Sequence, residues 1–335
     1  MKLSTPRWWY RREPPGAVTR MALTPLSWIW RGATARRIAR GAYESVGAPV
    51  ISVGNLTVGG SGKTPVAREL LRLLREAGVQ AHGLSRGYGG SQAGPLRVDS
   101  ERHTAAEVGD EPMMLARDGP FWVARDRLAG ARAAAASGAR AIVLDDGHQN
   151  PALARALSLV VVDGETRGGE WPFGDGAVFP AGPMREPLAA GLQRADAIVL
   201  LLPADLPRAD SELLALFGAK PVLTARLEPA VPPPAGRLLG FAGVAKPWKV
   251  ARALGAAGCE LVDFVSLPDH APLTESLLRD LAQTAADHQA GLVTTEKDWA
   301  RLPPEWRERV TAWPVRAVFE DEAAVRSLLD RTALN

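Results

Sequence analysis

The sequence predicts an α/β fold built on a doubly wound, mainly parallel sheet, with a second, smaller α/β domain. Two observations support this prediction. Apolar, β-branched runs alternate with helical patterns along most of the chain, as in proteins whose helices cover both faces of a sheet. The runs at 157–164 and 196–203 are continuously apolar, which is typical of parallel strands buried on both faces.

A glycine-rich segment joins the first apolar run, at 50–53, to a helical pattern with leucines at helical spacing. Glycine allows successive backbone N–H groups to point at an anion, and the positive end of a helix strengthens that field. Lysine and threonine at this joint suit phosphate oxygens and Mg²⁺. The sequence therefore predicts a phosphate-binding loop of the P-loop NTPase type, with these nucleotide-binding candidates: Thr57, Val58, Gly59, Gly60, Ser61, Gly62, Lys63 and Thr64.

Thr57 is the irregular position of this loop. The pattern GxxxxGK[ST] has glycine there, so an ordinary glycine-rich turn between strand and helix is the alternative. The strand pattern before the loop and the helical pattern after it favour phosphate binding.

Length and composition limit the classes of protein. The 335 residues are enough for two domains, and the single Cys259 excludes an internal disulfide. A net charge of +3 argues against a general nucleic-acid binder, and nothing indicates an obligate protein partner. A proline-rich stretch suggests a linker at 229–236, which separates a domain at 46–228 from a smaller one at 237–335.

Residues 1–45 form a basic, tryptophan-rich N-terminal segment. It carries nine of the Lys and Arg residues against two glutamates, and Trp8, Trp9, Trp28 and Trp30 lie in two clusters. Its apolar part is interrupted by arginine and proline and is too short to span a bilayer. Tryptophan with arginine is typical of a membrane interface, so we expect a helix in peripheral contact with anionic lipid. A helix packed on its own domain is the alternative.

Acidic residues follow two of the predicted elements. Asp145 and Asp146 end an apolar strand, as do the acids that hold Mg²⁺ in many P-loop proteins. Asp110 precedes a proline and an apolar run, so a helix N-cap is its ordinary interpretation. His270 alone would be an ordinary loop histidine, and Lys297 a solvated strand end. The glycine- and proline-rich stretch at 168–187 is long enough to predict a functional loop.

Taken together, these motifs resemble those of the tetraacyldisaccharide 4′-kinases, which phosphorylate the lipid A precursor of Gram-negative bacteria. The resemblance runs nearly end to end. It rests on these segments in this order: VGNLTVGGSGKTP, LSRGYGG, VGDEP, LDDGHQN, PAGPMREP, GFAGVAKP, LPDH and TTEKD.

The resemblance implies ATP as donor, Mg²⁺, a lipid disaccharide 1-phosphate as acceptor, and attachment to the cytoplasmic face of the inner membrane. It also implies an active site between the two domains. It assigns a catalytic role to Lys63, Asp110 and His270, with Asp110 as base. The implied metal site comprises Thr64, Asp145, Asp146 and Glu186, and the implied substrate contacts are Tyr88, Arg127, Gln149 and Arg185.

The chain departs from the family pattern at two places. The family commonly reads DDGFQH where this chain has DDGHQN, with His148 in place of the aromatic ring. It often reads PDHHPF where this chain has Leu273 in place of the phenylalanine. The two acids and the first histidine are kept. The departures therefore affect only the roles that the family's neighbouring aromatic and imidazole rings have.

A membrane-associated switch ATPase with protein partners is the alternative function. Such proteins carry a signature lysine just before the two glycines, where this chain has Val58. The motif that reads guanine has a residue order that TEKD at 295–298 does not match. A membrane adaptor without enzymatic activity would leave the P-loop and both acidic motifs unexplained.

Overall fold

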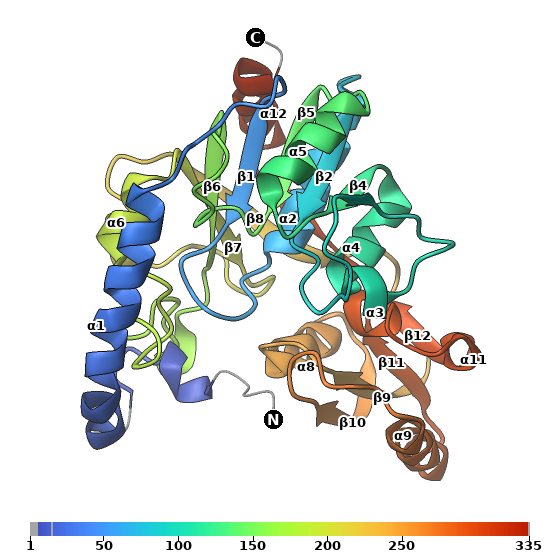
Figure 1. Cartoon of the computed structure of the whole chain (residues 1–335). Coiled ribbons are helices and arrows are strands. Elements are labelled where there is room, and N and C mark those ends of the chain that lie inside the picture. Colours follow the sequence, from blue (N-terminus) through green and yellow to red (C-terminus); the bar gives the residue numbers. More distant parts are fainter. Residues whose placement is uncertain (1–5, 15, 334–335) are drawn as a thin grey trace.

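The computed structural model describes residues 6–14 and 16–333. A nine-stranded sheet forms its larger part (Figure 1). The strands β8 to β4 of this sheet are parallel, and only the two edge strands are antiparallel to their neighbours. In spatial order they are β13 (Val315–Phe319), β8 (Val222–Pro229), β7 (Ala197–Leu202), β6 (Leu157–Asp163), β1 (Val50–Gly54), β5 (Ala141–Asp145), β2 (Ala81–Ser85), β4 (Phe121–Val123) and β3 (Leu96–Arg97).

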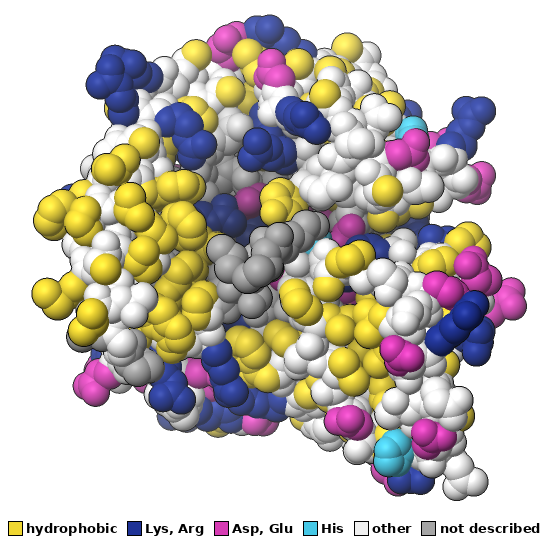
Figure 2. Space-filling view, turned by 60° about the horizontal axis from the view of Figure 1, so that its bottom comes forward, with side chains coloured by type: hydrophobic (Ala, Val, Ile, Leu, Met, Phe, Trp, Pro, Cys, Tyr) yellow, Lys and Arg dark blue, Asp and Glu magenta, His cyan; other side chains and the backbone are white. Residues whose placement is uncertain are grey.

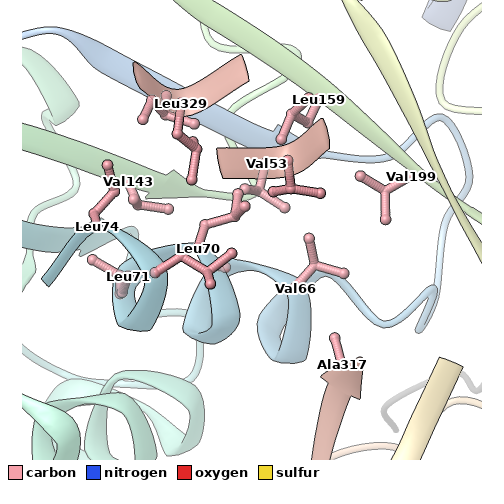
Figure 3. Packing of buried hydrophobic residues seen from close by; sticks show 14 of the residues in the cluster. Val53, Val66, Leu70, Leu71, Leu74, Val143, Leu159, Val199, Ala317 and Leu329 are labelled. Carbon is pink, nitrogen blue, oxygen red and sulfur yellow. The ribbon is translucent and has the colours of Figure 1, made fainter. Parts of the chain in front are cut away.

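Helices cover both faces of this sheet, because successive side chains of a strand point to opposite faces. Ile51 and Val53 of β1 pack in a core with α2 (Lys63–Glu76) and α12 (Glu322–Ala333), seen in Figure 3. Val50 belongs to the opposite core with α5 (Arg127–Ala136). Further along that face, α6 (Leu188–Gln193) and α7 (Ser211–Ala215) cover β6 and β7. The predicted doubly wound α/β fold is confirmed.

A second, four-stranded parallel sheet lies beside the first (Figure 1). Its spatial order is β10 (Glu260–Ser266), β9 (Arg237–Ala242), β11 (Gly291–Thr295) and β12 (Val310–Trp313). Phe241 packs with α9 (Glu275–Asp287) on one face, and Leu238 packs on the other with α8 (Pro247–Ala256). Two short helices, α10 (Glu296–Trp299) and α11 (Pro304–Arg307), connect β11 to β12.

The last strand and helix belong to the larger sheet. The sequence pattern predicted a smaller domain at 237–335, but β13 pairs antiparallel with β8 and α12 packs against α2. The chain therefore enters the second sheet after β8 and returns after β12. An apolar run such as 315–319 suits either sheet, so its sequence does not show which strand it joins. We propose 237–313 as the extent of the smaller unit.

The N-terminal segment lies along one side of the larger sheet as η1 (Arg7–Tyr10) and α1 (Ala17–Ala39) (Figure 1). Residues 1–5 and 15 of the predicted segment 1–45 lie outside the described residues. Within 6–14 and 16–333, no helix is long and apolar enough to cross a membrane. The remaining short helices are α3 (Ala105–Val108), α4 (Asp110–Leu115), η2 (Ala116–Asp118) and η3 (Arg167–Gly169).

Candidate active site

The glycine-rich loop joins β1 to α2, as the sequence predicted. Gly62 caps α2 with φ of 81°, and a Cβ added there would lie 2.2 Å from Leu201, so both backbone shape and space require glycine. Thr57 needs no glycine, because it forms an antiparallel bridge with Met184 in the 168–187 loop. The backbone N–H of Val58 donates to Pro183 at 2.7 Å. This second loop thus holds the nucleotide loop from one side.

Thr64 and the acids at the end of β5 form a site suited to Mg²⁺. Thr64 Oγ1 donates to Asp145 Oδ2 at 3.1 Å, while the other oxygen of Asp145 is buried and accepts no hydrogen bond. Such an unpaired buried oxygen beside a hydroxyl fits a small oxygen-coordinated cation. No group of three or more His, Cys, Asp or Glu side chains suited to a metal occurs in the described part of the chain. Mg²⁺ needs none, because it takes only one or two carboxylates besides water and phosphate oxygens.

The two adjacent aspartates have opposite electrostatic environments. Burial, with Glu111 nearby, raises the pKa of Asp145 to about 7, although Lys63 opposes the rise. Burial also acts to raise the pKa of Asp146, but Lys63 and Arg185 outweigh it and hold that pKa well below its usual range. Lys63 Nζ lies 3.7 Å from Asp146 Oδ1, and Arg185 Nη1 donates to the same oxygen at 2.8 Å. Asp146 is therefore ionised at neutral pH and engaged by two cations.

Glu186 does not join the two aspartates. Both of its oxygens accept from Arg194 Nη2 at 2.6 Å, and one also accepts from Gln149 at 3.0 Å. Only 3% of the residue is exposed. Arg185 beside it donates to the carbonyl of Thr57 at 2.9 Å. The predicted metal acid is thus part of a buried polar cluster that fixes the loop carrying Arg185, and sequence reasoning missed its partner Arg194.

Asp110 and His270 are in contact across the two sheets. Asp110 Oδ2 and His270 Nδ1 lie 2.9 Å apart, and Asp110 is 6% exposed. Asp110 is not the helix N-cap, since Gly109 holds that position with φ of 94° and no side chain caps the helix. The ring of Tyr88 lies 5.3 Å from that of His270. The structure therefore brings the predicted base, its histidine and one predicted substrate residue together.

Arg127, at the start of α5, is close to the nucleotide side of the site. Its Nε is buried and has no hydrogen-bond acceptor, while its Nη1 donates to the carbonyl of Arg125 at 3.0 Å. Burial lowers the pKa of Arg127 to about 10, helped by Arg86 and opposed by Asp146. The pKa stays far above neutral, so Arg127 is a cation with unused donor capacity, as expected of a residue that contacts an anionic ligand.

The smaller unit and the N-terminal segment are both tied to the larger sheet near the loop. Lys246 and Lys249, at the start of α8, contact Asp163 at the end of β6, at 2.6 and 2.5 Å. Tyr10 donates its hydroxyl to the carbonyl of Val58, and the Lys246 ammonium lies 4.0 Å from the centre of its ring. Tyr10, Lys246 and Lys249 thus tie the N-terminal segment and the smaller unit to the larger sheet near the nucleotide loop. Sequence reasoning missed all three residues.

Comparison with known proteins identifies the family. The family model for tetraacyldisaccharide-1-P 4′-kinase matches residues 19–333. This chain belongs to that family. A tetraacyldisaccharide 4′-kinase of Caulobacter vibrioides is 66% identical over 330 residues, covering 98% of each chain. One of Maricaulis maris is 50% identical over 316 residues, covering 94% of this chain and 91% of the relative.

The solved structure of LpxK from Aquifex aeolicus, described as in complex with ATP, has a similar fold. Its TM-score is 0.74 at 26% identity, over 94% of this chain and 99% of that one. This protein is therefore a phosphotransferase with an alcohol acceptor that uses ATP and acts in lipid A biosynthesis. The alternative of a switch ATPase is not favoured.

Proposed function

We propose that this kinase transfers the γ-phosphoryl group of ATP to the 4′-hydroxyl of a tetraacyldisaccharide 1-phosphate, with Asp110 as the general base. The contact between Asp110 and His270, at 2.9 Å, is the observation that carries the proposal. A buried carboxylate hydrogen-bonded to an imidazole is suited to accept a hydroxyl proton. Glu111, the next residue, is near enough to Asp145 to raise its pKa, so this base faces the nucleotide side of the site.

On the donor side, Lys63 and the backbone amides of the loop bind the phosphates. Thr64 and Asp145 are the candidates to hold Mg²⁺, because they combine a hydroxyl with the unpaired buried carboxylate oxygen. Mg²⁺ neutralises charge that develops on the phosphate oxygens during transfer. Asp146 keeps Lys63 and Arg185 oriented. Glu186 acts as a positioning residue for Arg185, held in turn by Arg194.

On the acceptor side, Tyr88 offers an exposed ring beside His270, and Arg127 offers unused donors for an anionic group. Gln149 orients the loop that carries Arg185, since it donates to Glu186 at 3.0 Å and to the carbonyl of Asn55 at 2.8 Å. These contacts support positioning of substrate and phosphate, which is the main requirement of phosphoryl transfer.

We also propose that α1 holds the enzyme at the cytoplasmic face of the inner membrane. The helix exposes a row of large apolar side chains, and Figure 2 shows hydrophobic side chains gathered on the side where α1 lies. Ile29 is 69% exposed and Trp28 67%. The opposite side of the helix is attached to the protein, since Ser27 donates to Val178 at 2.8 Å and Trp30 to the carbonyl of Arg185 at 3.1 Å. Four arginines, at positions 31, 36, 37 and 40, suit anionic headgroups.

Transfer of labelled γ-phosphate to a tetraacyldisaccharide 1-phosphate in detergent micelles tests the proposal. The wild type is expected to label the acceptor and Lys63→Ala to label none. ATP hydrolysis, measured with and without acceptor, separates the alternatives: a switch ATPase would hydrolyse ATP regardless of the acceptor. Absence of transfer by the wild type, with ATP bound, would overturn the assignment.

A further inference from the structure

Two further cations lie beside the Asp110–His270 pair. Both come from the segment after β11, with Lys297 inside α10 and Arg301 just beyond its end. The side chains are 18% and 11% exposed, respectively. Thr295 caps the helix by accepting from the N–H of Asp298 at 3.1 Å, so the position of both cations is fixed by a local motif.

Arg301 connects Asp110 to the loop that carries His270. Its Nε lies 3.3 Å from Asp110 Oδ2, and its Nη1 donates to the carbonyl of Ala271 at 2.7 Å. Its Nη2 contacts Asp298, which is fully buried and accepts from the N–H of Gly243 at 3.0 Å. The Nε–H makes no hydrogen bond, so the guanidinium acts on Asp110 through its charge and on the His270 loop through the hydrogen bond to Ala271.

Lys297 determines the tautomer of His270. Lys297 Nζ lies 3.2 Å from His270 Nε2, and an ammonium can only donate, so Nε2 is an acceptor. The proton of the imidazole is then on Nδ1, which donates to Asp110 Oδ2. Burial would lower the pKa of Lys297, but Glu111, Asp269 and Asp110 outweigh it and raise that pKa, so the side chain remains an ammonium.

The charged and titratable groups around the imidazole come from five segments. Asp110 and Glu111 face it from α4, Lys297 from α10, and Arg301 from the turn that follows α10. Asp269 lies next to it in its own loop, at 3.7 Å from Nε2, and Tyr88 faces it from the turn after β2.

We propose that Arg301 and Lys297 are positioning residues that assign the two oxygens of Asp110: Oδ2 is held by His270 and Arg301, and Oδ1 accepts the proton of the acceptor hydroxyl. This inference rests on the proposed function of Asp110 as base. In the step, the hydroxyl O–H bond breaks and its proton goes to Oδ1 while the oxygen forms a bond to the γ-phosphorus. The bond from that phosphorus to the β–γ bridging oxygen breaks, and ADP keeps the electron pair. Lys297 keeps Nε2 of His270 as an acceptor, so the Nδ1 proton stays directed at Oδ2 and Oδ1 is left for the hydroxyl proton.

The split between kcat and KM distinguishes positioning from mere structural support. In Lys297→Met, Nε2 of His270 loses its donor, so the ring can change tautomer and Oδ2 of Asp110 can lose the N–H that it accepts. In Arg301→Met, Oδ2 of Asp110 loses the cation that lies 3.3 Å away. Both variants are expected to lower kcat about tenfold or more, with KM for ATP within about threefold. Lys297→Arg and Arg301→Lys should restore part of the loss.

Arg307→Met is the matched control, since this nearby arginine contacts carbonyls of residues 300 and 302 and the ring of Trp299. Its kcat should equal that of the wild type. Arg301→Met leaves Asp298 buried without its cation, so thermal unfolding and ATP binding are measured for every variant, and Lys297→Met is decisive if Arg301→Met fails to fold. A wild-type kcat in folded Lys297→Met overturns the inference. Normal turnover of Asp110→Asn would overturn the base assignment itself, which is a distinguishable result.

Discussion

Asp110 Oδ2 and His270 Nδ1 lie 2.9 Å apart although 160 positions separate the two residues. In the proposed function, the acceptor side of the site is therefore formed where the two sheets meet. Replacing Asp110 by asparagine keeps the shape of the side chain and removes its basicity. We expect kcat to fall by about 10²–10⁴-fold, because that is the usual contribution of a general base. Steady-state transfer assays measure kcat, and nucleotide titration should show unchanged ATP affinity.

Asp118→Asn is the control for this substitution. Asp118 ends η2 in the same part of the chain and pairs with Arg68 at 2.6 Å. Its activity should remain close to that of the wild type. An Asp110→Asn enzyme with normal turnover would exclude Asp110 as the base.

Glu186 and Asp145 should respond differently to removal of their charge. Glu186→Gln leaves Arg194 largely buried beside a neutral amide, and removing one partner of a buried ion pair costs about 3–5 kcal/mol. We therefore expect a clear loss of thermal stability with an unchanged dependence of activity on Mg²⁺ concentration. Asp145→Asn should instead raise the Mg²⁺ concentration needed for activity and leave thermal stability largely unchanged, because the unpaired oxygen of Asp145 is the candidate ligand. A raised Mg²⁺ requirement in Glu186→Gln would support the metal role that the family resemblance implies for Glu186.

The apolar face of α1 should control binding to lipid. Trp28→Ser with Ile29→Ser removes two exposed apolar side chains, each worth about 1.5–3 kcal/mol when buried. We expect at least a tenfold loss in binding to vesicles of anionic lipid, measured by sedimentation, with ATP affinity unchanged. Leu214→Ser with Leu216→Ser is the control, since these side chains are 38% and 40% exposed at the end of α7. Equal binding of both double variants would contradict membrane attachment through α1.

The sequence predicted the donor half of the site better than the acceptor half. The loop residues from Gly59 to Thr64 work through local backbone geometry, which glycine spacing and the following helix reveal directly. Asp145 ends a strand of continuous apolar character, so its place at the edge of the sheet follows from the pattern. The contact of Asp110 with His270 was expected only from the family resemblance, because no local pattern brings these two residues together.

Residues that act through distant contacts could not be predicted. Arg194 and Arg301 lie in helical or turn segments where an arginine is usually solvated, and only the fold reveals their buried partners Glu186 and Asp110. The sequence pattern predicted Lys297 to be a solvated strand end, whereas Lys297 lies in α10 and contacts His270. The pairing of β13 with β8 could not be predicted for the same reason, since the composition of a strand does not determine its neighbour in the sheet.

His148 should make the stability of the enzyme depend on pH. Its ring is 1% exposed and contacts Ser158 Oγ and the carbonyl of Gly191. Burial, with Arg194 and Arg155 nearby, lowers the pKa of His148 to about 3, against about 6.5 in an unfolded chain. Between these two pH values the unfolded state binds more protons than the folded state. The contribution of His148 to the free energy of unfolding is therefore fully present above pH 6.5 and is lost as the pH decreases toward 3.

His148→Phe, which introduces the ring that the family commonly has, should remove this dependence. The variant loses the contacts to Ser158 and Gly191, so we expect it to be less stable at pH 7.5. At pH 5 the difference in free energy of unfolding between wild type and variant should be about 2 kcal/mol smaller than at pH 7.5. Urea unfolding at both pH values measures it, with the exposed His288→Phe as control. Parallel pH dependences of wild type and His148→Phe would show that His148 is not the group responsible.

Tyr10 connects the N-terminal segment to the nucleotide loop. Its buried hydroxyl donates to the carbonyl of Val58, and the ring carries the Lys246 ammonium on its face. Tyr10→Phe keeps the ring and leaves that carbonyl without this donor, at a cost of about 1 kcal/mol, which corresponds to roughly fivefold. We expect KM for ATP to rise by about this factor while kcat at saturating ATP stays unchanged. Tyr43→Phe is the matched control, because its hydroxyl donates to Ile38 at the end of α1, at 3.0 Å. If both variants had the same KM, the hydrogen bond from Tyr10 would have no part in shaping the loop for ATP.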